Sequence, residues 1–144
     1  MFALIDASQE REGTSYFEFH PRELPTEHAC WLPESMYLRD AAFDFYAECF
    51  HRADPEFDYF AFQRFDRRTI AVLSQELYIF TESLNSTASR ETLFSRYCSL
   101  FSTNIWSDVK TEYLVPRVRE TGTALNEFIR DHTETSGCLW VLGM

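Results

Sequence analysis

The stretch HRADPEFDYFAFQRFD, residues 51–66, decides how the chain is expected to fold, because an acidic turn leads directly into a dense aromatic run. Pro55 and the acids around it favour a turn over ADPEFD. The run FDYFAFQRF then alternates as a strand does. Its two faces carry Phe57, Tyr59, Ala61 and Phe65 on one side, and Phe60 and Phe62 on the other. Since both faces are largely apolar, we expect residues 57–65 to form an interior strand and not an edge strand.

Downstream of this strand the sequence predicts helices and then a returning strand. Asp66 is a suitable N-cap, and apolar residues follow it at helical spacing: Ile70, Leu73, Leu77, Phe80 and Leu84. Further helices are expected from about residue 90 to residue 101 and from about residue 107 onward, with Pro116 breaking or restarting the latter. The last apolar run, CLWVLGM at 138–144, predicts a strand that returns to the sheet.

Upstream, two short strands and a helix are predicted. The run FALI at 2–5 and the alternating SYFEFH at 15–20 favour a hairpin, in which Phe17 and Phe19 share the inner side. The proline-rich PRELPTEHACWLPES is expected to be a loop. A helix is expected over 33–52, because Met36, Phe43, Tyr46 and Phe50 fall on one side of a helical projection.

These elements together predict an α+β fold in one domain. The 144 residues fit a single domain, 1–144, that buries enough surface to fold without a disulfide or a metal. We expect a mostly antiparallel sheet of about four strands, with four to five helices packed mainly on one face.

The charge of the chain is strongly negative and unevenly distributed. The net charge is −10, and residues 1–66 hold 14 of the 23 acids but 5 of the 13 basic residues. Such a chain repels nucleic acid and anionic membranes, so neither is expected as a partner. A basic protein is the partner that the charge favours.

The acids of the predicted helix and of the turn after it form the candidate binding surface. Asp40, Asp44 and Glu48 are spaced four residues apart, and like charges at that spacing oppose helix formation. The alternative is a solvated face that only aids solubility. With one aromatic sheet face added, the candidate partner-binding residues are Asp40, Asp44, Glu48, Asp54, Glu56, Asp58, Tyr59 and Tyr16.

Metal binding and catalysis are not expected. His28 with Cys30, and Cys49 with His51, look like two halves of a zinc site, but the second pair would diverge on a helix. The sequence holds no G-x-S-x-G elbow and no phosphate-binding glycine loop. We therefore predict no catalytic residue, no metal and no cofactor.

The N-terminal residues also bear on the compartment. MFALIDASQEREG has neither a basic n-region nor a long apolar core, so we expect no signal peptide. The four cysteines, at widely spaced positions, are then expected to be reduced thiols in a cytoplasmic protein.

In general character, the sequence resembles the small acidic immunity proteins of bacterial polymorphic-toxin and contact-dependent growth inhibition systems. The features that carry the resemblance are an acidic single domain without a catalytic motif, and the layout DYFAFQRFDRRTIAVLSQELYIF at 58–80, an aromatic strand that leads into a capped helix. The resemblance implies a toxin-neutralising protein that binds and occludes a basic cognate toxin domain, for example a nuclease. The alternatives are a self-associating adaptor domain, which would form a homodimer, and an enzyme without a recognisable motif.

Overall fold

The chain folds into an antiparallel sheet with helices on one face. The computed structural model describes residues 5–6, 15–25, 31–98 and 105–143. The five strands are β1 (Ile5–Asp6), β2 (Tyr16–His20), β3 (Met36–Arg39), β4 (Phe62–Asp66) and β5 (Cys138–Gly143). The described helices are α1 (Asp40–Phe43), α2 (Ala47–Ala53), α3 (Arg67–Ser83), α4 (Arg90–Phe94) and α5 (Thr111–Thr133). The strand order is β1-β3-β2-β5-β4, with every pair antiparallel.

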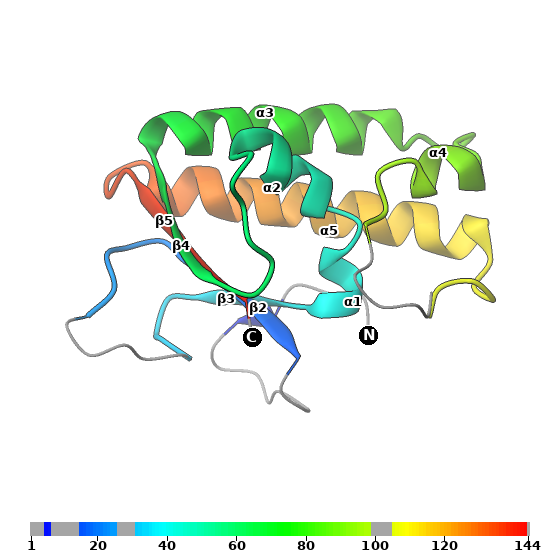
Figure 1. Ribbon diagram of the computed structural model, residues 1–144. Helices are drawn as coiled ribbons and strands as arrows, with labels where there is room; N and C mark the ends of the chain where they lie inside the picture. Colours follow the sequence, from blue (N-terminus) through cyan, green and yellow to red (C-terminus); the bar gives the residue numbers. More distant parts are fainter. Residues whose placement is uncertain (1–4, 7–14, 26–30, 99–104, 144) are drawn as a thin grey trace.

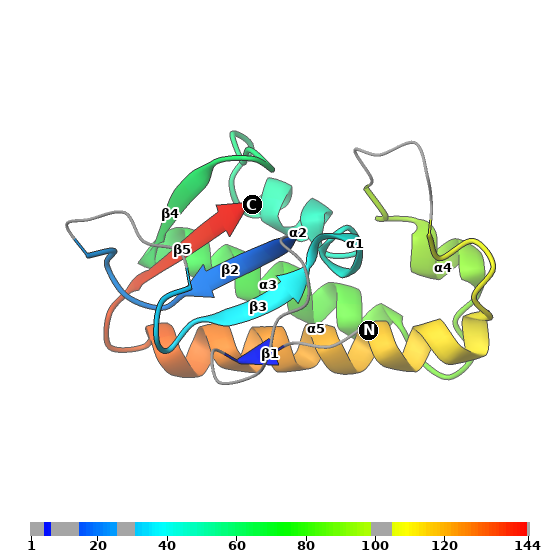
Figure 2. The ribbon, with the colours of Figure 1, turned by 90° about the horizontal axis from the view of Figure 1, so that it is seen from below.

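The sheet and the long helices form two layers. The helices α3 and α5 lie side by side and run in opposite directions over one face of the sheet, with α2 against α3 (Figure 1). Figure 2 shows the strands in front of these helices, with β1 and β4 at the two edges. The expected α+β class, with helices mainly on one face, is confirmed.

The strand register assigns each side chain to one of two faces. Phe19 and Gln63 both pair with Val141, so these three residues share one face. Phe19 packs on Phe43 of α1 and Phe50 of α2, so this face is the one that the helices cover. Glu18 pairs with Leu142 and with Tyr37, which places all three on the outer face. The alternation predicted for residues 15–20 is therefore present in β2.

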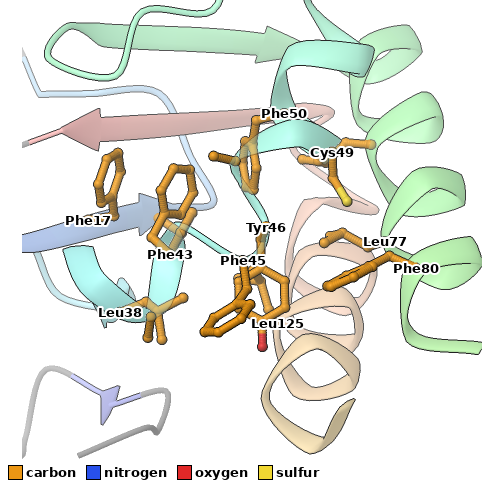
Figure 3. Close-up of a cluster of buried hydrophobic side chains, with 14 of the residues drawn as sticks. Phe17, Leu38, Phe43, Phe45, Tyr46, Cys49, Phe50, Leu77, Phe80 and Leu125 are labelled. Carbon is orange, nitrogen blue, oxygen red and sulfur yellow. The ribbon is translucent and has the colours of Figure 1, made fainter. Parts of the chain in front are cut away.

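The core is dominated by phenylalanine. Phe43 of α1 stacks on Phe17 of β2 with ring centroids 3.8 Å apart and lies 4.9 Å from Phe50 of α2 (Figure 3). Phe57, in the turn before β4, packs on Phe50 of α2 and on Phe65 of β4. Each fully buried Phe stabilises the fold by about 1.5–3 kcal/mol, so this cluster joins the sheet to the short helices.

A glycine allows α5 to approach the rest of the core closely. A Cβ on Gly122 would lie 2.7 Å from Thr81 of α3 and 2.9 Å from the ring of Tyr46. The Tyr46 hydroxyl donates to the carbonyl oxygen of Val118 at 2.6 Å. The loop residue Tyr46 thus joins α2 to α5 in the interior.

Two predicted elements, α3 and β5, are confirmed. Asp66 caps α3 by accepting a hydrogen bond from the Thr69 N–H at 2.8 Å. The apolar positions expected along this helix are all buried. The final strand, β5, returns to the sheet and lies between β2 and β4.

The prediction of a single helix over residues 33–52 is wrong. Met36–Arg39 form β3, and only the short helices α1 and α2 follow. The main chain of Met36–Arg39 pairs with β2 on one side and with β1 on the other. The spacing of the apolar residues was compatible with a helix or with a strand, and pairing with β1 and β2 makes this segment a strand.

The interior strand expected over 57–65 is also wrong. Only Phe62–Asp66 form a strand, and that strand is at the edge of the sheet. The two-faced alternation itself is real, since Phe57 and Phe65 are buried. Phe60 is 66% exposed and Phe62 is 40% exposed. The second face of this segment is therefore apolar but not buried.

Smaller differences concern the first strands and α5. β1 pairs with β3, so the expected hairpin between residues 2–5 and 15–20 is not formed by the described residues. Of the helix expected over 90–101, only Arg90–Phe94 (α4) is helical; residues 95–98 are not, and residues 99–104 lie outside the described part. α5 continues through Pro116, which lies in its second turn, where the missing N–H removes one helical hydrogen bond.

Candidate protein-docking surface

The turn between α2 and β4 is anchored by alternate aromatic side chains. Phe57 is 5% exposed and packs against Phe50 and the ring of His51. Tyr59 is 7% exposed, and its ring meets Phe17 edge-on at 4.7 Å. Asp58, between the two anchors, and Phe60, after the second, are exposed.

Side-chain hydrogen bonds fix the shape of this turn. Asp54 accepts a hydrogen bond from the Glu56 N–H at 3.0 Å, and Asp58 accepts one from the Phe60 N–H at 3.0 Å. Gln63 holds the turn from its far side, because its amide accepts from the Asp58 N–H and donates to the Asp58 carbonyl. Asp turns of this kind are locally stable, so these hydrogen bonds add to the core contacts of Phe57 and Tyr59 in holding the turn.

The anchored turn presents acids and aromatics together. We define the docking surface as Asp54, Glu56, Asp58, Phe60 and Phe62. Glu56 and Asp58 are exposed and Asp54 is half-buried, and none of these three acids forms an ion pair among the described residues. Phe60 and Phe62 are thus exposed near three carboxylates that have no basic partner among the described residues.

The other predicted binding acids lie in different settings. Asp40 opens α1 and is half-buried, with its carboxylate near its neighbour's N–H. Glu48 lies in the first turn of α2 and pairs with Arg52 at 3.2 Å. These two acids lie on separate short helices, so the single helical stripe predicted from sequence does not exist.

Asp44 and Tyr59 face each other inside the protein. Asp44 is 2% exposed and accepts a hydrogen bond from the Tyr59 hydroxyl at 2.7 Å. Burial, followed by this hydrogen bond to Asp44, raises the pKa of Tyr59 well above its usual value. Neither side chain offers a surface for a partner, which corrects the prediction that both would bind one.

Tyr16 is also covered. It is 3% exposed on the outer sheet face, where its ring meets Trp31 edge-on and lies beneath the Arg39 guanidinium. The outer face near Tyr16 is thus packed under Trp31 and is not the open aromatic surface that the sequence suggested.

A buried carboxylate holds this cover in place. Glu18 is fully buried, and it accepts hydrogen bonds from the Trp31 N–H at 2.9 Å, the Leu32 N–H at 2.7 Å and the Tyr37 hydroxyl at 3.0 Å. A buried charge needs such donors to be tolerated. Glu18 therefore acts as a clamp between β2 and the segment before β3.

A histidine and a serine lie beside this clamp. The Nδ1 atom of His20 is 2.8 Å from the Ser35 hydroxyl oxygen. Ser35 is 1% exposed, and burial lowers the pKa of His20, partly offset by the charge of Glu18. A substrate has no access to this hydroxyl in the described conformation, so the pair is best explained as part of the clamp.

The cysteines and histidines considered for zinc are not brought together in the described residues. Cys49 is fully buried in α2, and burial raises the pKa of its thiol to about 12. No group of three or more His, Cys, Asp or Glu side chains in the described ranges is arranged to hold a metal ion. His28 and Cys30 lie outside those ranges.

A hollow lies between α3 and α5. This open groove of about 690 Å³ has Ser74 and Asn126 in hydrogen-bond contact along its wall. Its charged lining is mixed, with Arg67 and Arg130 opposed by Asp131 and Glu134. Such a lining favours no particular ligand charge.

Comparison with known proteins gives no further assignment. No family model, no curated protein and no solved structure matches the chain. Within the part of the chain that the structure describes, no helix is both long and apolar enough to cross a membrane.

The sequence analysis did not include the two exposed aromatics, Phe60 and Phe62, among the candidate binding residues. Phe60 and Phe62 were placed in an apolar strand face, while Tyr59 and Tyr16 were preferred as contacts. The alternation of FDYFAFQRF did contain the needed signal, since it separated Phe60 and Phe62 from Phe57 and Phe65. The alternation alone did not indicate which of the two faces the helices would cover.

Proposed function

We propose that this protein is a binding protein that docks a basic partner protein through the docking surface and acts by occlusion. The observation that carries the proposal is Phe60, which is 66% exposed on a turn fixed by hydrogen bonds and surrounded by acids without ion pairs among the described residues. Exposed aromatics on a rigid turn bind at low entropic cost. The acids would attract a basic partner and raise the association rate.

The class of protein that fits this mode of action is the bacterial immunity protein. Such a protein would bind a cognate toxin domain in the cytoplasm and cover its basic substrate groove, with no catalysis of its own. The uneven charge of the chain supports this proposal, because 14 of its 23 acids lie within residues 1–66, which include the docking surface.

The test is co-purification with the product of the adjacent gene, followed by binding measurements on purified proteins. Changing Phe60 to Ala should weaken binding about thirtyfold, as expected for the loss of about 2 kcal/mol at a central aromatic contact. Changing Glu56 to Lys should mainly slow association and reduce its dependence on salt.

A matched control is Tyr78→Ala, because Tyr78 is 55% exposed on α3, away from the turn. It should bind as the wild type does. Loss of binding in Tyr78→Ala together with normal binding in Phe60→Ala would move the interface to the helical layer. If no adjacent product binds at any salt concentration, the immunity function itself is wrong.

A further inference from the structure

One edge of β4 has no strand partner among the described residues. β5 pairs with the other edge over Phe62–Asp66 (Figure 2). Exposed edge strands readily pair with another chain unless charges, proline or a covering segment protect them. β4 is five residues long and contains no proline, its charged residues are Arg64 and Asp66, and Phe62 is exposed at its start.

The hydrogen-bonding pattern between β4 and β5 shows which main-chain groups of β4 face the open edge. Gly143 donates its N–H to the carbonyl oxygen of Ala61, in continuation of the β4–β5 register. Hydrogen-bonded and non-hydrogen-bonded pairs alternate in an antiparallel ladder, so Gln63 is bonded to β5. The N–H and C=O groups of Phe62 and Arg64 therefore point away from β5.

The charges around β4 are arranged by sign. Acids precede the strand, with Glu56 and Asp58 exposed in the turn. At the other end lie three exposed arginines, Arg64, Arg67 and Arg68, and one exposed acid, Asp66, so that end carries a net positive charge. An antiparallel copy of the same edge would place the acidic end of one chain beside the basic end of the other.

We propose that two copies of this chain associate through their β4 edges across a two-fold axis, forming one continuous antiparallel sheet. Outward-pointing residues must face each other in such a pairing. The register that sets Phe62 opposite the second copy's Arg64 avoids an Arg–Arg contact and lays a guanidinium against a ring. Arg64 pairs with Glu23 in the isolated chain, and such an exposed ion pair is weak enough to rearrange.

The dimer should be weak and should compete with the partner. An edge of five residues spans about 17 Å, which makes a small interface. Association should therefore be lost on dilution. Because Phe62 belongs to both interfaces, a basic partner should displace the second copy; this consequence, unlike the dimer, rests on the proposed function.

Sedimentation velocity of the purified chain over a dilution series, without any partner, tests the dimer. We expect twice the monomer mass at high concentration and a monomer on dilution. Arg64→Pro removes an outward N–H at an edge, where proline is tolerated, and should leave a folded monomer by circular dichroism. Should this variant not fold, Phe62→Lys replaces it, because it places two positive charges opposite each other.

Charge reversal tests the orientation of the pairing. Glu56→Lys or Arg68→Glu should each weaken dimerisation by about two- to fivefold, and the double variant should restore it. Ile79→Lys, at an exposed apolar position of α3, is the control and should dimerise normally. A wild-type monomer at all concentrations, or normal dimerisation of both Arg64→Pro and Phe62→Lys, would overturn the proposal. Failure of the double variant to recover would exclude this antiparallel two-fold arrangement.

Discussion

At the scale of single residues, burial separates the acids that support the fold from those that are free to bind. Glu18 and Asp44 are enclosed with hydrogen-bond donors, whereas Glu56 and Asp58 face solvent. Since Asp44 is 2% exposed, a lysine there would bury a charge opposite no partner and destabilise the fold.

Glu18→Gln should destabilise the protein by about 2–3 kcal/mol. The amide of glutamine can replace only one of the two carboxylate oxygens, so one of the N–H donors of Trp31 and Leu32 would face another donor. Urea unfolding of wild type and variant at neutral pH measures this difference.

The control is Glu34→Gln, because Glu34 forms an exposed ion pair with Arg22. It should change the free energy of unfolding by less than about 0.5 kcal/mol. Equal effects of the two substitutions would mean that the buried clamp contributes no more than a surface pair.

At the scale of elements, long periodic segments could be predicted and short ones could not. α3 was predicted from five apolar positions and a capping Asp, signals that no strand produces together. Met36–Arg39 has too few residues to show a period, and its strand pairing with β2 depends on a partner distant in sequence. The edge position of β4 likewise depends on where β5 inserts, which local sequence does not encode.

Gly122→Ala tests the close approach of α5 to α3 and Tyr46. Alanine is favoured over glycine in a helix by about 1 kcal/mol, but its Cβ would lie 2.7 Å from Thr81 and 2.9 Å from Tyr46, both buried. We expect steric crowding to prevail and to give a net destabilisation of about 1–3 kcal/mol, measured by chemical unfolding.

Thr123→Ala is the matched control, since Thr123 is exposed on the same helix. It should be neutral or slightly stabilising, because alanine has the higher helix propensity. A Gly122→Ala variant that is more stable than wild type would show that the helices separate at little cost.

At the scale of the whole molecule, the sequence could predict the fold class but only part of the docking surface. The class follows from the order of strand and helix patterns, which small errors in boundaries do not alter. The acidic turn at Glu56 and Asp58 was also predicted, because proline and acids keep it at the surface. The burial of Asp44 could not be predicted, because it depends on a contact with Tyr59, which lies 15 residues later in the sequence.

Global stability should fall as the pH drops below about 6.5, and His20 should contribute to the decrease. Burial lowers the pKa of His20 in the folded chain from its usual 6.5. Below that value the unfolded chain binds a proton that the folded chain does not, so protonation favours unfolding. Urea unfolding between about pH 7.5 and 5.5 should show a smaller decrease in His20→Gln than in wild type. An equal decrease in both would assign the acid sensitivity to carboxylates.

Stability should also fall at alkaline pH, through the buried thiol of Cys49. Burial raises the pKa of Cys49 from 9.0 to about 12 in the folded chain. Between those values the unfolded chain has lost a proton that the folded chain retains, so the free energy of unfolding decreases as the pH rises. Burial acts in the same direction on Tyr46 and Tyr59, so part of the decrease should remain without the thiol.

Cys49→Ala lowers stability at every pH by leaving a small cavity, but its decrease between about pH 8 and 10.5 should be shallower than that of wild type. Parallel curves for the two proteins would mean that Cys49 ionises equally in the folded and unfolded chains, contrary to its burial.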